Sequence, residues 1–177
     1  MAEQQGAEDK DERQTNGGDE GPQAGLISQY VKDFSFENPN APAVYQWQSQ
    51  PQIDVQVNIG AQKLADGVHE SALKLEVSAK VEQGVAFQLE LVYAALFALR
   101  NIPEDRIQPF LLAEAPRLMF PFARRIVADA IRDGGFPPLM LEPLDFERLY
   151  QQRAQQQQVE DAGKESGDEE DAPTGSA

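Results

Sequence analysis

The sequence predicts an α+β fold, in which a four-stranded antiparallel sheet is followed by a long helix and a shorter C-terminal helix. Three segments in the first half of the chain alternate apolar and polar residues with a period of two, which is typical of half-buried strands. In the second half, the apolar residues recur at helical spacing instead. Strands that come first and helices that come after indicate the α+β class.

The three alternating segments are separated by short connections that contain glycine. Asp66-Gly67 and Gln83-Gly84 lie between them and favour hairpins. The apolar residues of the three segments are, in order, Ile53, Val55, Val57 and Ile59; Leu73, Leu75, Val77, Ala79 and Val81; and Val85, Phe87, Leu89, Leu91 and Tyr93. We therefore expect these strands to lie in a meander-like order.

Residues 26–37 are expected to form the fourth strand, although their apolar residues alternate less regularly. Residues 38–51 connect this strand to the next and contain three prolines, which are excluded from the interior of a sheet. The same connection carries Tyr45 and Trp47, so it is expected to fold over something apolar. We interpret it as a crossing loop that covers the sheet.

A long helix is predicted from Glu104 to the Gly134-Gly135 pair, with acidic residues in its first turn and glycine at its end. Pro116 and Pro121 lie within it and are expected to bend or break it locally. A second, short helix is predicted to begin near Asp145, a good N-cap, and to end among the glutamines that follow residue 150. No internal repeat is evident.

The two ends of the chain differ in composition from its centre. Residues 1–25 carry −5 and residues 158–177 carry −6 of the formal net charge of −15. Both ends are polar and acidic and lack aromatic residues, so they cannot bury enough apolar surface to offset the entropy of ordering. We expect a folded domain at residues 26–157 between disordered acidic tails at 1–25 and 158–177.

The composition argues against catalysis and cofactors. The chain contains no cysteine, which excludes disulfides, thiolate nucleophiles and Cys-ligated zinc. The single histidine, His69, is expected to be an exposed turn residue, and one histidine cannot build a multi-His metal site. No nucleophile–base pair and no phosphate-binding glycine motif is recognisable, so we expect neither an enzyme nor a cofactor.

Charge and hydropathy indicate the compartment and the class of partner. A net negative surface repels phosphate backbones, which disfavours nucleic-acid binding and favours a basic protein partner. The N-terminus lacks the features of a signal peptide, and the longest apolar run, 91–99, is far shorter than the roughly 20 residues that span a bilayer. These observations predict a cytoplasmic protein.

Apolar residues exceed what one sheet and two helices are expected to hide. They gather at 136–144, in the crossing loop and at 91–97. Large apolar patches mark oligomer or ligand surfaces, so we expect self-association and an apolar groove for extended peptides. Two alternatives stay open: an adaptor oligomer that binds one folded partner, and a hydrolase that would lose its activity on Glu90→Gln.

Three stretches of the chain carry a family resemblance: 30–42 (YVKDFSFENPNAP), 118–124 (LMFPFAR) and 135–146 (GFPPLMLEPLDF). Over residues 26–152 the sequence resembles SecB, the bacterial protein-export chaperone family. The resemblance implies a homotetramer, a dimer of dimers with helices between two outer sheets. It also implies ATP-independent holding of unfolded precursor proteins and their delivery to the export motor SecA.

The resemblance assigns roles to individual residues. Asp33, Glu37 and Glu90 match family positions that receive the basic, zinc-binding tail of SecA, although Gln88 stands where the family often has leucine. The family's subunit-contact stretch is matched by Leu89, Leu91 and Tyr93, whose apolar character a core role explains equally well.

Unfolded clients are expected to bury apolar side chains against a further set of residues, at about 25 cal/mol per Å². This set consists of Tyr45, Trp47, Leu139, Met140, Leu141 and Phe146.

Overall fold

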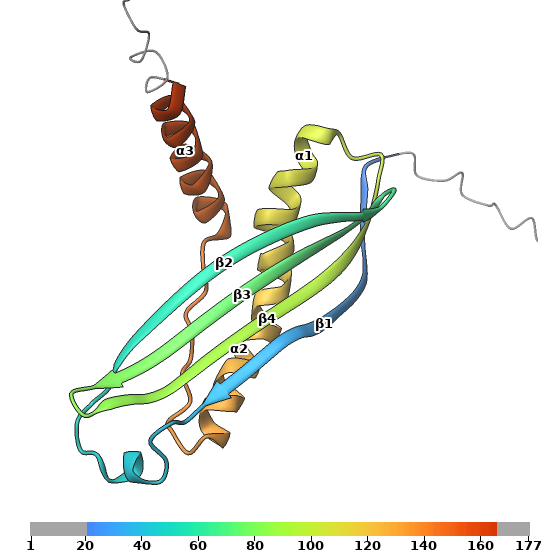
Figure 1. The fold of residues 1–177 in the computed structure, drawn as a ribbon. Helices are drawn as coiled ribbons and strands as arrows, with labels where there is room; N and C mark the ends of the chain where they lie inside the picture. Colours follow the sequence, from blue (N-terminus) through green and yellow to red (C-terminus); the bar gives the residue numbers. More distant parts are fainter. Residues whose placement is uncertain (1–20, 166–177) are drawn as a thin grey trace, which may run out of the picture.

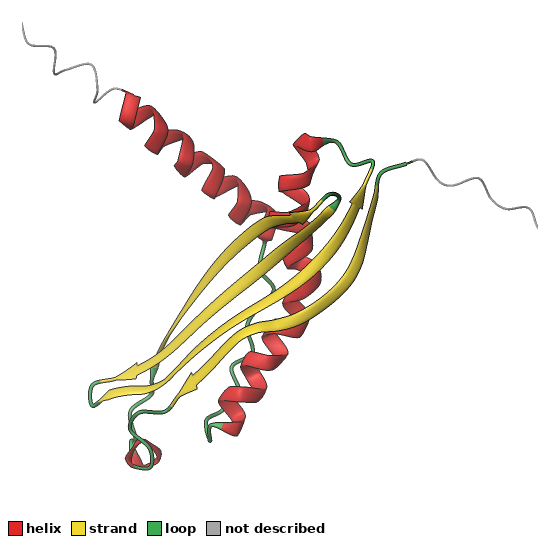
Figure 2. Ribbon diagram, turned by 45° about the vertical axis from the view of Figure 1, so that its right-hand side comes forward, coloured by secondary structure: helices red, strands yellow, loops and turns green. Residues whose placement is uncertain are grey.

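In the computed structural model the described residues are 21–165. Residues 1–20 and 166–177, which hold most of the two predicted acidic tails, lie outside the described residues. Four long antiparallel strands form one sheet: β1 (Gln23–Glu37), β2 (Gln52–Ala65), β3 (Val68–Val81) and β4 (Gly84–Arg100). One face of this sheet is covered by helices (Figures 1 and 2).

The order of the strands across the sheet is β1-β4-β3-β2. Strands β2, β3 and β4 follow one another through hairpins, as the sequence predicts, but β1 returns to pair with β4. This arrangement is a Greek key and corrects the expected meander-like order. The β1–β2 connection must therefore pass from one edge of the sheet to the other, which confirms that this loop crosses; it runs around the end of the sheet and does not cover a face of it (Figure 1).

The helical half begins with α1 (Glu104–Pro109), continues through a π-helical turn (Phe110–Glu114) and runs on as α2 (Ala115–Asp133). The irregular turn lies between Pro109 and Pro116 and includes Leu112, whose carbonyl would clash with the ring of Pro116 in a regular helix. The local irregularity expected at Pro116 is therefore present in the turn just before it, where the carbonyl of Leu111 accepts a hydrogen bond from the Ser71 hydroxyl at 2.7 Å. α2 runs through the exposed Pro121 without ending.

The core lies between the inner face of the sheet and this helical segment. Alternate residues of β3 and β4 point toward the helices and are almost fully buried. The largest buried side chains come from both layers: Leu73, Leu75, Val77, Leu91, Phe97, Leu111, Met119, Val127 and Ile131. Each stabilises the fold by about 1.5–3 kcal/mol through removal from water.

The C-terminal helix α3 (Phe146–Glu165) is capped as predicted, because the backbone N–H of Arg148 donates to Asp145 Oδ1 at 3.0 Å. It runs through the glutamines to Glu165, past the domain boundary expected at residue 157, and is longer than the short helix predicted. Its first turns carry the contacts with the body of the chain. There Arg153 Nη1 donates to the carbonyl of Ile59, in edge strand β2, at 2.7 Å.

Candidate functional site

An apolar groove of about 370 Å³ lies where the crossing loop meets the segment that follows α2. Its walls include Trp47 and Pro51 from the crossing loop, and Phe136 and Leu139 from the other segment. Phe87 of β4 also lines it. We call this feature the apolar groove; its prolines and apolar side chains suit an extended, apolar chain.

Four aromatic rings hold the two segments together. Phe36 of β1 lies 5.9 Å from Phe87, Phe87 lies 4.8 Å from Phe136, and Phe136 lies 5.7 Å from Tyr45, measured between ring centroids. The Tyr45 hydroxyl donates to the carbonyl of Gly134 at 2.9 Å. This row of rings joins the sheet, the crossing loop and the end of α2, so the shape of the groove depends on all three.

The structure separates the six residues predicted to contact clients. Trp47 and Leu139 line the apolar groove. Tyr45 and Met140 are exposed beside it, at 52% and 63%, and Leu141 is half-buried. Phe146 is 3% exposed and packs edge-on against Phe120 of α2, at a centroid distance of 5.6 Å, so it anchors α3 in the core.

A second candidate surface is the outer face of the sheet, opposite the helices. A shallow hollow of about 360 Å³ on this face is lined by four carboxylates and one lysine: Glu37, Asp54, Glu76, Glu90 and Lys80. They come from all four strands, because facing residues are paired in rows across the sheet: Ser35–Glu90–Glu76–Gln56 and Glu37–Gln88–Ser78–Asp54. We call this feature the acidic hollow; its excess of carboxylates suits a basic partner.

Lys74 partly neutralises the acidic hollow. Its Nζ lies 3.1 Å from Glu90 Oε1 and 3.2 Å from Glu76 Oε1. These hydrogen bonds, that with Glu90 first, raise the pKa of Lys74 above its ordinary value. Glu76 and Glu90 face each other on neighbouring strands, and the positive charge of Lys74 offsets the repulsion between their two negative charges.

All three residues predicted to receive the SecA tail lie on the outer face. Glu37 and Glu90 line the acidic hollow, and Asp33 lies farther along β1, opposite Val92. Gln88, the departure from the family pattern, is exposed in the row that contains Glu37. Sequence reasoning missed Asp54, because its role depends on the pairing of β2 with β3.

Leu89, Leu91 and Tyr93, predicted as oligomer contacts, are only 3%, 0% and 7% exposed in the single chain. They face the helices and build the core, so they offer little surface to another subunit. Other apolar residues are exposed instead. Those on edge strand β1 and on the outward side of α2 are Leu26, Ile27, Val31, Phe34, Leu118 and Phe122.

His69 corrects another expectation. It is 8% exposed and faces the helices, because β3 begins at Val68 and includes it in the strand rather than in the turn. Its Nδ1 has no hydrogen-bond partner among the described residues. Within residues 21–165, no group of three or more His, Cys, Asp or Glu is placed to hold a metal ion. No helix in that part of the chain is long and apolar enough to cross a membrane.

The comparisons with known proteins agree on one family. The family model of the preprotein translocase subunit SecB matches residues 18–157. The chain belongs to the SecB family. It is 60% identical over 150 residues to the protein-export protein SecB of Sphingopyxis alaskensis, covering 85% of this chain and 87% of that protein. It is 63% identical over 138 residues to that of Zymomonas mobilis, covering 78% and 84%.

A solved structure shows the same fold. A SecB-like chaperone of Mycobacterium tuberculosis, in complex with a peptide from an antitoxin, superimposes with a TM-score of 0.57 over 68% of this chain and 90% of that one. The two sequences are 16% identical, so this likeness supports the fold alone. The predicted α+β, SecB-like architecture is thereby confirmed.

Proposed function

We propose that this SecB-family protein holds unfolded precursor proteins for export, without ATP, by taking extended apolar segments into the apolar groove. The observation that carries this proposal is the groove itself, which combines the only tryptophan of the chain, Trp47, with the Phe136–Leu139 segment. Prolines in both walls remove backbone donors, so the walls recognise side chains with little sequence specificity. Each buried Å² of apolar client surface contributes about 25 cal/mol.

Trp47 provides the test, because its fluorescence reports directly on the groove. Titration with a slow-folding precursor in its unfolded form is expected to shift the emission to shorter wavelength, and the folded form is expected to leave it unchanged. Leu139→Asp should weaken this binding by about tenfold or more, since it places a charge in an apolar site. Leu64→Asp, an equally drastic change at an exposed hairpin residue, is the matched control.

Equal binding of the folded and unfolded forms would contradict the chaperone proposal and favour an adaptor that binds one folded partner. A wild-type emission that does not change with either form would contradict the use of this groove.

The acidic hollow is proposed as the docking surface for SecA. Asp33, Glu37 and Glu90 lie on one face and would receive the motor's basic, zinc-binding tail through charge attraction. Affinity for a synthetic tail peptide loaded with zinc is expected to fall with rising salt. Glu90→Gln should also lower it, whereas Asp129→Asn, on α2, should not.

The proposed assembly is a homotetramer, a dimer of dimers. Two surfaces of the single chain support it: the exposed apolar residues of β1, which lies at the edge of the sheet and has a neighbouring strand on one side only, and those of α2. Native mass spectrometry should show four chains, and a stable monomer would contradict the proposal. Several grooves on one particle would add avidity for a long client.

The compartment and chemistry follow from the same proposal. A protein that intercepts precursors before export works in the cytoplasm, and holding them by burial of apolar surface requires neither catalysis nor a cofactor. Cell fractionation should recover the chain with the cytoplasmic proteins. Client binding should be unchanged by ATP or by its removal.

A further inference from the structure

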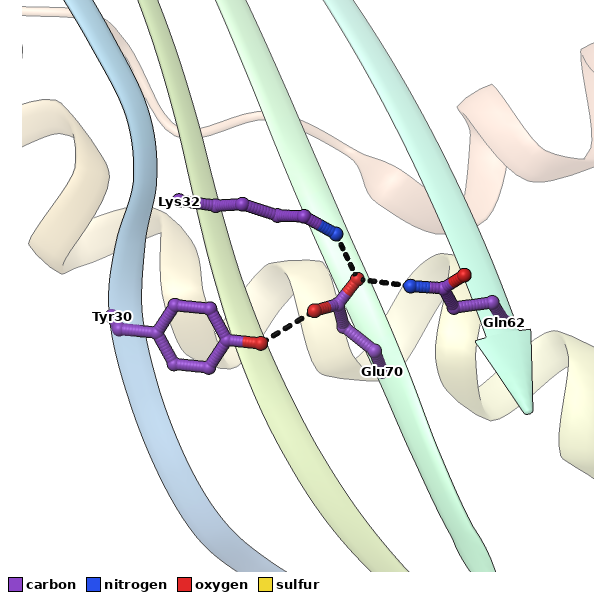
Figure 3. Close-up of polar contacts among 4 residues, drawn as sticks. All are labelled: Tyr30, Lys32, Gln62 and Glu70. Carbon is purple, nitrogen blue, oxygen red and sulfur yellow. Dashed lines mark hydrogen bonds and ion pairs between the residues drawn. The ribbon is translucent and has the colours of Figure 1, made fainter. Parts of the chain in front are cut away.

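A second polar feature of the outer face lies away from the acidic hollow. Glu70 of β3 accepts three hydrogen bonds there: from the Tyr30 hydroxyl at 2.5 Å, from Lys32 Nζ at 2.6 Å and from Gln62 Nε2 at 2.8 Å (Figure 3). Tyr30 and Lys32 belong to edge strand β1, so their side chains reach across β4 to meet Glu70. We call these four residues the Glu70 cluster.

Glu70 differs from the other outer-face carboxylates in its burial. It is 5% exposed, whereas Glu90 and Glu76 are half-buried at the surface. Burial alone would raise the pKa of the Glu70 carboxyl, but the hydrogen bonds from Lys32, Tyr30 and Gln62 outweigh burial and lower it. A buried, charged carboxylate with three donors is costly to disturb, so the cluster fixes its members firmly in place.

Lys32 occupies an unusual position in β1. Val31 pairs with Tyr93 and Asp33 pairs with the next residue of β4, Val92, so Lys32 is the extra residue of a β-bulge. Before the bulge, Tyr30 faces outward, opposite Ala94, and after it Asp33 and Glu37 face outward as well. The bulge thus reverses which residues of β1 point to each face.

Without the bulge, uninterrupted pairing from Val31 onward would place Asp33 opposite Leu91 and Phe34 opposite Glu90. The side chains of Asp33 and Glu37 would then point toward the helices, and those of Phe34 and Phe36 would point to the outer face. Within one chain, β1 is an edge strand and pairs only with β4, so its ladder there resists such a shift less than that of a central strand.

We propose that Glu70 is a positioning residue that pins the bulge at Lys32 and so places Asp33 and Glu37 on the outer face beside Glu90. Tyr30, which precedes the bulge in β1, and Lys32, the bulged residue, both donate hydrogen bonds to the Glu70 carboxylate. Glu70 lies on β3, which is not adjacent to β1 in the sheet. Only the last step, the effect on a docked partner, rests on the proposed SecA function. The control of register stands by itself.

Pairs of introduced cysteines test the register directly, because the chain has no cysteine of its own. Ser35→Cys with Glu90→Cys joins residues that are paired in the bulged register, and Phe34→Cys with Glu90→Cys joins residues that would pair without the bulge. We expect the first pair to oxidise readily and the second poorly. Adding Glu70→Gln should slow the first and speed the second.

Binding of the zinc-loaded SecA tail peptide tests the consequence. Glu70→Gln is expected to weaken it about tenfold, although Glu70 lies outside the acidic hollow. Asp66→Asn, in the turn between β2 and β3, is the matched control, since it also removes one negative charge and one ion pair with a lysine, Lys63 at 3.1 Å. It should leave both the affinity and the cysteine pattern unchanged.

Deletion of Lys32 separates positioning from general stability. The shortened strand would alternate regularly from Tyr30 through Glu37 with the same residues outward, so the register would no longer need the cluster. In that background, Glu70→Gln should affect neither cross-linking nor affinity. A purely stabilising role for Glu70 would leave the effect of the substitution in place.

An unchanged cysteine pattern in folded Glu70→Gln protein would overturn the proposal. If that variant does not fold, Tyr30→Phe, which removes one hydroxyl, takes its place and is judged by the same pattern. A wild-type protein that does not bind the tail peptide would contradict SecA docking at the acidic hollow, while the cysteine pattern would still decide the register. The expected pattern, cancelled by deletion of Lys32, would establish Glu70 as the positioning residue.

Discussion

At the scale of single residues, the apolar groove depends on contacts that leave no room for substitution. Gly135 has a φ of +85°, and a Cβ built on it would lie 2.9 Å from Cε1 of Tyr45. At Gly134 a Cβ would lie 2.3 Å from Cζ of Phe36. The glycine pair therefore does more than end α2, because it lets the crossing loop and β1 close over that end.

Gly135→Ala is expected to destabilise the protein by about 1–3 kcal/mol, because it combines an unfavourable φ with a clash against Tyr45. Gly60→Ala in β2 is the control, since a Cβ there meets nothing within 4 Å. Denaturant unfolding of both variants measures the difference. Equal stability of the two variants would show that the Tyr45 side chain can move away from the added Cβ at no cost in free energy.

The Glu70 cluster makes stability depend on pH at both extremes. The hydrogen bond with Glu70 raises the pKa of Tyr30 from its ordinary value of 10.0 to about 12, so its contribution is present below pH 10.0 and is lost as pH rises toward about 12. The pKa of Glu70 is lowered from its ordinary value of 4.5, so its contribution to the stability of the fold is present above pH 4.5 and is lost as the pH falls below that value.

The difference in unfolding free energy between wild type and Tyr30→Phe is therefore expected to shrink between about pH 10 and 12. That between wild type and Glu70→Gln should shrink below about pH 4.5. Denaturant unfolding at several pH values measures both. A difference that stays constant would show that the groups are not coupled in solution.

At the scale of elements, the sequence predicts which segments form strands and helices better than it predicts how they meet. The three regular strands are predicted from their alternation, because their pairing keeps one register along most of its length and shifts only near the two turns, at Lys63/Ala65 and at Ala79/Lys80. The irregular spacing of Val31, Phe34 and Phe36 was noticed, and the bulge at Lys32 is its cause. The bulge itself could not be inferred, because it depends on Glu70, far away in the sequence.

The helices show a similar division. The irregularity predicted at Pro116 is present as the π-helical turn that directly precedes it, whereas Pro121, on an exposed side of α2, does not end the helix. The length of α3 was underestimated, since glutamine is a good helix former.

Arg153 is expected to hold α3 against the sheet, because its guanidinium donates to Ile59 O at 2.7 Å and to Asn58 Oδ1 at 3.2 Å. Arg153→Ala should remove a charge-assisted bond that contributes about 1.5–3 kcal/mol and should speed amide hydrogen exchange in the first turns of α3. Arg148→Ala, an exposed position on the same helix, serves as control. Equal exchange in the two variants would indicate that Phe146 anchors the helix alone.

At the scale of the whole molecule, the surplus of apolar residues in the sequence indicates binding surfaces. It does not show which apolar residues belong to a binding surface and which belong to the core. From the sequence, Leu89, Leu91 and Tyr93 cannot be distinguished from Leu118 and Phe122 as candidates for a subunit contact, because all five are apolar. Only the packing of α2 on the inner face of the sheet shows that the first group is core. The acidic surface was easier to predict, because Glu90 alternates with buried neighbours along one strand.

Leu118→Arg, at a position that is 52% exposed on α2, is expected to disrupt the proposed tetramer by burying an unpaired charge at a subunit contact. Native mass spectrometry should then show smaller assemblies. Leu64→Arg, 51% exposed at the β2–β3 hairpin, should leave four chains together. A tetramer that persists in Leu118→Arg would place the contact elsewhere.

The Greek key order also governs how the chain is made. β1 emerges first from the ribosome, yet its partner β4 ends at Arg100, so translation at about 5–20 residues per second leaves β1 unpaired for several seconds. Its apolar residues and free backbone groups are open to other chains during that interval. Closing so long a loop is also slow. A protein that is proposed to bind unfolded chains is therefore itself, during its own synthesis, an incompletely folded chain with exposed apolar residues.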